Sequence, residues 1–221
     1  MMDEIKAGQR EWKPGRVFLI GKNYREHVSE LGDPPSEGPV VFMKPASSLM
    51  PPGAVVRMPS HGAVLHHEVE VVALIGREGR AISESVAESH VFAYALGVDL
   101  TLRDVQGRLK KQGLPWEPSK AFDESAPLGP FTTAAGIAAA GIPFHCSVNG
   151  QVRQRGHTRD MIYPLGRIIR ELSKVWMLRP GDLIFTGTPA GVGPLSPGDT
   201  LRVESPVLKA ASWRFEGPIE C

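Results

Sequence analysis

Two glutamates and an aspartate supply the residue types and the spacing for metal chemistry. Glu68 and Glu70 are separated by a single residue in H-H-E-V-E-V-V-A-L-I-G (residues 66–76). This β-branched and apolar run predicts a strand. Side chains alternate along a strand, so both carboxylates would point to one face, about 6–7 Å apart along the backbone. Like charges at about 4 Å repel by several kcal/mol, which a proton, a basic side chain or a metal ion must offset.

Asp99 lies on a second predicted strand. Residues 93–102 alternate strictly between small side chains, with Asp99 among them, and large apolar ones. Small residues beside a carboxylate leave room for a ligand, although a solvent-facing strand would fit the same pattern. Together with Glu68 and Glu70, Asp99 would offer hard oxygen ligands to Mg²⁺, Mn²⁺ or Ca²⁺, with positions left for water or substrate. Pairing with arginine or lysine is the alternative, and spacing alone does not choose between the two.

His27 and Glu30 form a second group with chemical potential. The sequence predicts a short helix over residues 24–31, ended by Gly32 and the proline pair 34–35. Histidine and glutamate three residues apart share one face of such a helix. The periodicity alone favours a solvated surface helix, while the glycine and prolines beside it are also typical of a mobile lid.

These groups need a framework, and the rest of the chain predicts a β-rich α+β one. The 24 glycines and 20 prolines favour many turns, and Asn149-Gly150 marks a hairpin over residues 144–152. Pro164 is tolerated in the first turns of a helix predicted over 158–176. Further strands are predicted over residues 16–21, 40–44, 55–58, 183–186 and 200–204, further helices over 83–91 and 103–112, and a proline-rich loop with Lys120 over 113–130.

Composition limits the possible functions. The 221 residues fit one domain, with residues 1–15 as a peripheral lead-in and 16–221 as a single domain. A net charge of +1 provides no general attraction for nucleic acid or an anionic membrane. Cys146 and Cys221 make neither a disulfide framework nor a metal-ligand pattern, which favours a reducing, cytoplasmic location.

Targeting and common catalytic motifs are not evident. Residues 1–12 are charged, so no signal peptide is expected, and the longest apolar run, 134–144, is too short to span a bilayer. The sequence contains no Walker A, H-E-x-x-H, C-x-x-C or G-x-S-x-G motif. The glycine-rich segment 187–193 opens no predicted helix, and it is either a close backbone approach to a ligand or a plain loop.

Six segments in a fixed order resemble the fumarylacetoacetate hydrolase family, in particular small single-domain members such as the acylpyruvate hydrolases. The resemblance spans about residues 16–215 and rests on G-K-N-Y-R-E-H (21–27), F-M-K-P (42–45), H-H-E-V-E (66–70), D-L-T-L-R-D-V-Q (99–106), K-A-F-D (120–123) and T-G-T-P-A-G-V-G (186–193). It implies a mixed β-sandwich or β-roll of the C-terminal-domain type, a homodimer, and a divalent metal held by Glu68, Glu70 and Asp99. The N-terminal domain and extra acidic ligand of the large animal enzymes have no obvious counterpart, so water is expected to complete the coordination.

The resemblance also implies a reaction. Such enzymes hydrolyse a C–C bond beside a carbonyl group in acylpyruvates such as acetylpyruvate or fumarylpyruvate, and the metal stabilises the leaving enolate. His27, oriented by Glu30, would take a proton from the attacking water, which reverses the preference for a plain surface helix. Lys120 and Gln106 would position the substrate and stabilise the oxyanion. Three residues would hold the substrate carboxylate: Lys44, Arg103 and Thr188. Surface salt bridging is the alternative for the two basic residues of that set.

Two rival functions stay open. Similar family members decarboxylate or tautomerise oxaloacetate, or isomerise and decarboxylate intermediates of aromatic breakdown, and the same metal-stabilised enolate would serve all of these. His27 and Glu30 favour hydrolysis, because hydrolysis needs a positioned water. The other rival is a non-catalytic, metal-free β-rich binding protein in which basic side chains neutralise the carboxylates. His66 and His67 adjoin the predicted metal strand, and neither is expected to bind the ion directly.

Overall fold

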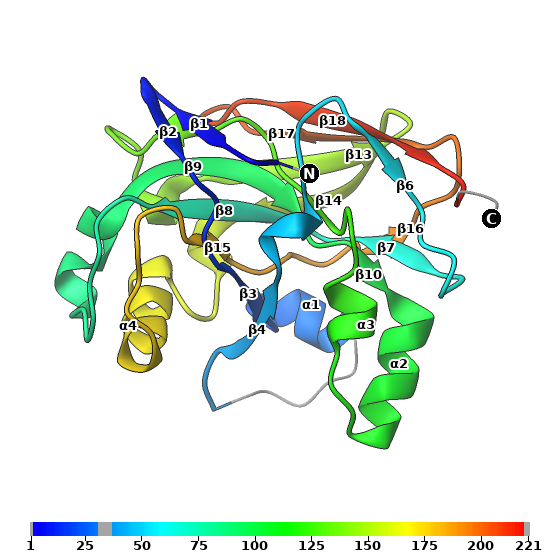
Figure 1. Cartoon of the computed structure of the whole chain (residues 1–221), viewed down its shortest axis with the longest axis horizontal. Coiled ribbons are helices and arrows are strands. Elements are labelled where there is room, and N and C mark those ends of the chain that lie inside the picture. The colour runs from blue at the N-terminus through cyan, green and yellow to red at the C-terminus, as the bar shows by residue number, and fades with distance from the viewer. Residues whose placement is uncertain (1, 31–36, 219–221) are drawn as a thin grey trace.

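The computed structural model describes residues 2–30 and 37–218, which form two layers of β-sheet with helices around them (Figure 1). Its strands are β1 (Ile5–Ala7), β2 (Arg10–Trp12), β3 (Val17–Gly21), β4 (Val40–Lys44), β5 (Leu49–Met50), β6 (Val55–Arg57), β7 (Leu65–His67), β8 (Val69–Ile75), β9 (Val91–Val98), β10 (Thr101–Leu102), β11 (Ala126–Pro127), β12 (Thr132–Thr133), β13 (Pro143–Val148), β14 (Gln151–His157), β15 (Leu183–Phe185), β16 (Gly193–Pro194), β17 (Thr200–Glu204) and β18 (Ala211–Glu216). Its helices are α1 (Arg25–Glu30), α2 (Arg103–Gln112), α3 (Glu117–Lys120) and α4 (Leu165–Val175), with the 3₁₀ helices η1 (Ala46–Ser48), η2 (Glu84–His90), η3 (Ala139–Gly141) and η4 (Thr158–Asp160). In this described part of the chain, no helix has the length and apolar character needed to cross a membrane.

Two large sheets supply the layers. The six-stranded sheet has the order β12-β9-β8-β15-β3-β4, and the five-stranded sheet has the order β14-β13-β17-β18-β6. Their neighbouring strands are antiparallel, except that β15 runs parallel to β3 and β18 runs parallel to β6. Smaller sheets join β10-β7-β16, β11-β5 and β1-β2. This is the β-rich α+β, sandwich-like mixed fold that the sequence predicted.

The central strand β8 is buried on both faces, as its sequence predicts. Val69 and Val71 lie in the hydrophobic cluster that residues of β13, β17 and β18 also enter. Val72 and Leu74 lie in a second cluster on the opposite face, together with Ile5 of β1. Because side chains pack on both of its faces, β8 is a rigid support for the carboxylates at its start.

The two strands that carry the carboxylates are interrupted where the carboxylates stand. Glu68 lies between β7 and β8, and Asp99 lies between β9 and β10. Both segments change sheets at this point, since β8 and β9 pair in the six-stranded sheet whereas β7 and β10 pair in the three-stranded one. The Asp99 N–H donates to the Glu68 carbonyl at 2.8 Å. The prediction of two unbroken strands was therefore wrong, and this crossing is what brings Glu68 and Asp99 together.

The small face of β9 is filled by protein. A side chain at Gly97 would come within 2.7 Å of the Phe185 ring, and Ala93 and Ala95 lie in the same cluster as Phe185. The small residues therefore make room for neighbouring side chains, which corrects the expectation of ligand space along this face. Asp99, just beyond the end of the strand, does border a cavity.

Helix α4 is shorter than predicted. Pro164 is its N-cap residue, with φ −57° and ψ 155°, and the helix begins at Leu165. Proline lacks an N–H group and disfavours helical backbone in the residue before it, so the preceding residues cannot continue the helix. The apolar stripe is confirmed at Ile168, Ile169 and Leu172, which are buried.

Other segments also differ from expectation. Residues 83–91 contain the 3₁₀ helix η2, and the predicted loop over 113–130 contains α3 and β11. The lead-in contains the hairpin β1–β2, whose Ile5 side chain is buried. The hairpin at Asn149-Gly150 is confirmed, and its φ angles of 51° and 78° are the positive values that such a turn requires.

The position of α1 is fixed by the turn before it. Buried Asn23 donates to the carbonyl groups of Thr186 (2.7 Å) and Tyr163 (3.1 Å) and accepts from the Tyr163 N–H. The structure confirms a short helix here, at Arg25–Glu30. Gly32 and the prolines at 34–35, which were predicted to end the helix and to mark a lid, lie outside the described residues.

Candidate active site

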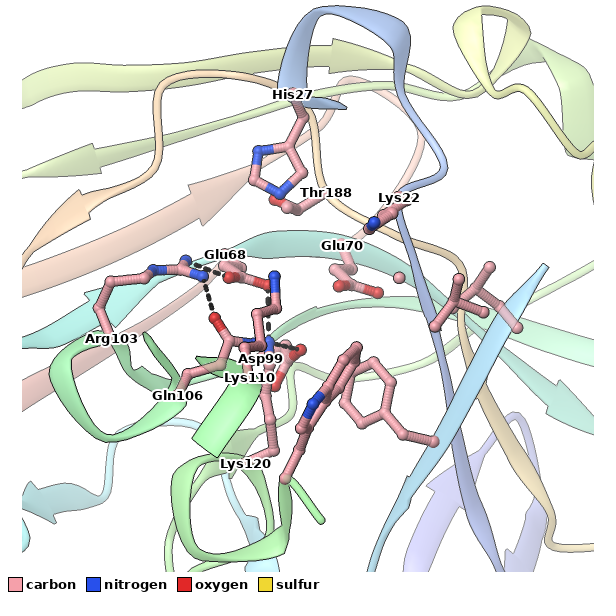
Figure 2. A pocket seen from close by; sticks show the side chains of 15 residues that line it. Lys22, His27, Glu68, Glu70, Asp99, Arg103, Gln106, Lys110, Lys120 and Thr188 are labelled. Atoms are coloured by element: carbon pink, nitrogen blue, oxygen red, sulfur yellow. Dashed lines mark hydrogen bonds and ion pairs between the residues drawn. The ribbon is translucent and has the colours of Figure 1, made fainter. Parts of the chain in front are cut away.

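One cavity gathers most of the predicted site residues (Figure 2). It encloses about 40 Å³ and lies where Glu68, Glu70 and Asp99 meet, with one carboxylate oxygen of each within 4.8 Å of the others. All three residues are at least 95% buried, so their charges need nearby compensation. The lining also includes His27, Arg103, Gln106, Lys120, Thr188, Lys22 and Lys110.

Glu68 is neutralised by two basic side chains. Lys120 Nζ donates to its Oε2 at 3.0 Å, and Arg103 Nη2 donates to its Oε1. Burial alone would raise the pKa of Glu68, but Lys120 and Arg103 hold that pKa well below its usual range. Glu68 is therefore a charged oxygen ligand with a fixed orientation.

Asp99 is held between two lysines. Its Oδ1 lies 2.9 Å from Lys44 Nζ, and its Oδ2 accepts from Lys120 at 2.6 Å. The Lys44 side chain is fully buried and is not part of the cavity lining. Its Nζ also donates to the Leu100 and Lys120 carbonyl groups. Burial lowers the pKa of Lys44 to about 8, against the opposing effect of Asp99. Lys44 therefore supports Asp99 from behind and does not face a ligand.

Glu70 has a different environment from the other two carboxylates. Its Oε2 accepts the Gly187 N–H at 2.7 Å, and among the described residues no basic side chain pairs with it, whereas Glu68 and Asp99 each have two basic partners. Burial raises the pKa of Glu70 well above its usual range, and the charges of Asp99 and Glu68 raise it further. The buried carboxylate of Glu70 is therefore left without a counter-charge.

The backbone of the glycine-rich segment 187–193 reaches this same group. Gly187 has a φ of 99°, and a side chain there would come within 2.6 Å of Asn23 Cβ, so glycine alone fits both the conformation and the space. The segment is therefore more than a plain loop: its backbone approaches Glu70.

The donor set fits a divalent cation. Carboxylate oxygens are the hard ligands that Mg²⁺ and Mn²⁺ prefer, and the spacing allows one ion to contact all three groups. The surroundings of Glu70 test whether an ion fits here. An ion shared with Glu68 and Asp99 would supply the counter-charge that no basic side chain among the described residues provides to Glu70. The three basic side chains that pair with Glu68 and Asp99 equal the three carboxylates in number, although none of them pairs with Glu70. A bound divalent ion would therefore leave net positive charge for an anionic substrate.

His27 reaches the cavity from α1. Its ring is almost fully buried, and its Nδ1 lies 3.2 Å from Glu30 Oε2. Glu30 also accepts the Gly191 N–H, at 3.2 and 3.3 Å to its two oxygens. A carboxylate at Nδ1 favours the tautomer with hydrogen on that atom, which leaves the Nε2 lone pair to accept a proton. Figure 2 shows the ring pointing from α1 toward Thr188 and the carboxylates. The structure thus brings the predicted pair together, with Glu30 behind His27.

The predicted substrate-facing groups are partly occupied by one another. Arg103 Nη1 donates to Gln106 Oε1 at 2.7 Å, and its Nη2 engages Glu68. Because Gln106 Oε1 accepts that bond, its Nε2 hydrogens are the ones left to face the cavity. Lys120 uses its three hydrogens on Thr101 Oγ1 (2.6 Å) and on the two carboxylates named above. In this arrangement, Arg103 and Lys120 therefore hold the carboxylates of the candidate metal site in position.

Gln154 is a site-forming residue that the sequence did not reveal. It lies on β14 and is 1% exposed, and its Nε2 donates to Thr188 Oγ1 and to the Pro189 carbonyl, both at 2.8 Å. Its Oε1 accepts the Val69 N–H at 3.0 Å and lies 2.9 Å from His67 Nδ1. One buried amide therefore ties the five-stranded sheet to the Thr188 loop and to the start of β8. A glutamine within the polar run Q-V-R-Q-R gives no sign of burial.

Two further lysines were missed. Lys110, predicted to be solvated, is half-buried, lines the cavity and lies with its Nζ 5.5 Å from the Trp116 ring centroid. Lys22 lines the cavity as well, in a left-handed conformation with φ 59°. The basic character of the helix predicted over 103–112 indicates that Lys110 is solvated, because the turn that carries Trp116 cannot be foreseen from α2 alone.

Comparison with known proteins gives a consistent result. A family model described as fumarylacetoacetate (FAA) hydrolase C-terminal matches residues 16–213. The chain is 40% identical over 217 residues to the mitochondrial oxaloacetate tautomerase of Mus musculus, covering 97% of both chains. It is 43% identical over 197 residues to an oxaloacetate tautomerase of Escherichia coli K12, covering 87% of this chain and 89% of the relative.

A solved structure agrees with these relatives. Fumarylpyruvate hydrolase from Pseudomonas aeruginosa, in complex with Mn²⁺ and pyruvate, superposes with a TM-score of 0.91 at 36% identity, covering 98% of this chain and 97% of that one. The family match, the identity and the shared fold all extend over nearly the whole chain. This chain therefore belongs to the fumarylacetoacetate hydrolase family, as a member of its C-terminal-domain type.

Proposed function

We propose that this chain is a divalent-metal-dependent hydrolase that cleaves the C–C bond of acylpyruvates. The observation that carries the proposal is the His27–Glu30 pair, which faces the three carboxylates across one cavity. Hydrolysis needs a base for water beside a site that stabilises negative charge. His27 would be the base, and a divalent ion held by the three carboxylates would stabilise the charge. The Mn²⁺ and pyruvate in the Pseudomonas aeruginosa enzyme support a site for a metal ion and a 2-oxo acid.

The proposed reaction assigns a proton path to His27. A divalent ion held by the carboxylates would supply the positive charge that stabilises an enolate leaving group. His27 Nε2 takes a proton from water, the water oxygen bonds to the acyl carbon, and the C–C bond to the pyruvyl methylene breaks. The proton on His27 then passes to the enolate carbon, which completes pyruvate and releases a carboxylic acid. Glu30 holds the ring in place and stabilises the imidazolium between the two transfers.

The remaining side chains bind and orient the substrate. Gln106 has free Nε2 hydrogens to donate to the oxyanion. Arg103 and Thr188, which both line the cavity, would contact the substrate carboxylate, and Lys120 would reach the same ligand by exchanging one of its present bonds. Lys44 is proposed as a positioning residue for Asp99, because its ammonium group lies behind that carboxylate.

Keto–enol tautomerisation of oxaloacetate is the second candidate. The observation that favours it is the 40% and 43% identity to two oxaloacetate tautomerases over most of the chain. The reaction moves a proton between a carbon and an enol oxygen beside a stabilised enolate. His27 would serve as the base for that transfer as well, and no water molecule would have to be positioned.

Parallel assays separate the two reactions. We expect the Mg²⁺- or Mn²⁺-loaded protein to hydrolyse acetylpyruvate or fumarylpyruvate, and His27→Gln to lower kcat by about 10²–10⁴-fold. Lys111→Gln, at an exposed position of α2, is the control and should change nothing. Conversion of enol-oxaloacetate without any acylpyruvate hydrolysis would replace the first proposal with the second. Turnover of neither substrate class would contradict both.

A further inference from the structure

An apolar groove adjoins the carboxylate cavity. Residues 40–43 of β4 form one side of the groove, and residues 113–117, between α2 and α3, form the other. The groove has a volume of about 410 Å³, whereas the cavity between the carboxylates and His27 has about 40 Å³. Four residues line both spaces: Val40, Phe42, Trp116 and Lys120. The groove and the cavity are therefore neighbours that share one wall.

The groove has the chemistry of a site for an apolar ligand. Strand β4 is the edge of the six-stranded sheet, and its V-V-F-M run is half-buried along its whole length. On the opposite side Leu114 is 47% exposed, and the Trp116 ring packs edge-on against Phe42 with the centroids 6.0 Å apart. Edge strands usually carry charged side chains, so an apolar edge that faces exposed apolar residues indicates a surface that something covers.

The charges around the groove limit what that ligand can be. Lys120 lines the end next to the cavity, where its ammonium group lies between Glu68 and Asp99 and, in the proposed function, contacts the pyruvyl carboxylate. Glu117, an exposed acidic residue of α3, also lines the groove. A second carboxylate at the far end of a ligand would meet this like charge, whereas an uncharged tail would not.

We propose that this groove binds the acyl group of the substrate, so that the enzyme prefers acylpyruvates with an aliphatic or aromatic acyl group. The inference rests on the proposed use of the carboxylate cavity for a 2-oxo acid. The small polar cavity would hold the reacting head, and a longer substituent would extend past Phe42 and Trp116, which line both spaces. Each methylene buried in the groove is expected to raise kcat/KM by about fourfold.

A chain-length series tests the preference in turnover. The kcat/KM for acetylpyruvate, butanoylpyruvate, hexanoylpyruvate and benzoylpyruvate should rise with apolar size and exceed that for fumarylpyruvate, which ends in a carboxylate. Leu114→Asp should lower kcat/KM for hexanoylpyruvate about tenfold more than for acetylpyruvate, because it places a charge in the groove. Val152→Asp is the matched control, since Val152 is 42% exposed on β14, and it should leave this ratio unchanged.

A binding series separates the groove from the reaction. Calorimetric titration of the Mg²⁺-loaded protein with pyruvate, 2-oxohexanoate and 2-oxooctanoate should show affinity that rises with tail length and loses this dependence in Leu114→Asp. If no acylpyruvate is hydrolysed but this dependence is present, the proposed function fails and the groove stands. An affinity that ignores tail length, or a preference for fumarylpyruvate, overturns the groove.

A second copy of the chain is the other occupant that the experiment detects. Sedimentation velocity of the wild type and Leu114→Asp should give the same oligomeric state if the groove takes the acyl group. A change of state in Leu114→Asp without a change in tail preference would assign the groove to a subunit contact and overturn the proposal.

Discussion

Glu68 and Glu70 stand two residues apart, and the structure gives them opposite electrostatic surroundings. Glu68 is paired with Lys120 and Arg103, whereas Glu70 receives the Gly187 N–H and has no basic partner among the described residues. The E-x-E pattern predicts that both side chains share one face of the strand. It does not predict which basic side chains pair with which glutamate. Those partners lie many residues away, and their distance from each glutamate depends on where α2 and α3 pack.

Substitution of the two glutamates by glutamine should move stability in opposite directions. In metal-free protein, Glu70→Gln removes a carboxyl group whose ionisation is opposed by burial and by the charges of Asp99 and Glu68, and it is expected to stabilise the fold by about 1–2 kcal/mol. Glu68→Gln leaves Arg103 without its carboxylate and Lys120 with Asp99 alone, and it should cost about 3 kcal/mol. Urea unfolding at pH 7 with a chelator measures both values. Equal destabilisation by both variants would contradict the assignment of partners.

At the scale of elements, the site is built where two strands change sheets. Glu68 and Asp99 each fall in the short gap between a strand of the six-stranded sheet and one of the three-stranded sheet. Alternation predicted the faces of β8 and β9 correctly, because packing on both sides enforces it. The gaps could not be predicted, because a strand that continues into another sheet keeps a strand-like sequence throughout.

The burial of Gln154 could not be predicted from its local sequence either, and its role can be tested by substitution. Gln154→Met keeps the size of the side chain but leaves the Val69 N–H and the Pro189 carbonyl without partners in a buried site. We expect a loss of about 3 kcal/mol in unfolding free energy, because each orphaned buried group costs about 1–3 kcal/mol.

Metal affinity should fall as well, because Gln154 fixes the residue next to Glu68. Gln151→Met, at an exposed position of the same strand, is the control and should be neutral. If Gln154→Met is as stable as the wild type, the hydrogen bonds of Gln154 do not stabilise the site as proposed.

At the scale of the whole molecule, local sequence patterns predicted many of the secondary-structure elements correctly. The apolar run of β8, the Asn149-Gly150 hairpin and the stripe of α4 all specify local structure through their own residues. β1, β2 and β18 escaped prediction, because β1 and β2 are only three residues long and β18 depends in part on pairing with the distant β6. The homodimer implied by the family resemblance stays a prediction, as do the division at residue 15 and the cytoplasmic location.

The buried thiol of Cys146 should make the free energy of unfolding depend on pH. Burial raises the pKa of this thiol to about 12, whereas an unfolded cysteine ionises near pH 8.5. The neutral thiol is favoured in the folded state, so its contribution to stability is complete below about pH 8.5 and is lost as pH rises toward 12. Between pH 8 and 10 the wild type should lose about 1–2 kcal/mol more than Cys146→Ala, measured by urea unfolding. Parallel pH dependence in the two proteins would show that this thiol ionises freely in the fold.

The central claim is that Glu68, Glu70 and Asp99 hold one divalent ion beside the base His27. Calorimetric titration with Mn²⁺, combined with acetylpyruvate assays on the same preparations, tests it most directly. The wild type should bind one ion per chain, Asp99→Asn should lose both binding and turnover, and His27→Gln should keep wild-type affinity while its kcat falls by about 10²-fold or more. Undiminished binding by Asp99→Asn, or normal turnover by His27→Gln, would contradict the account.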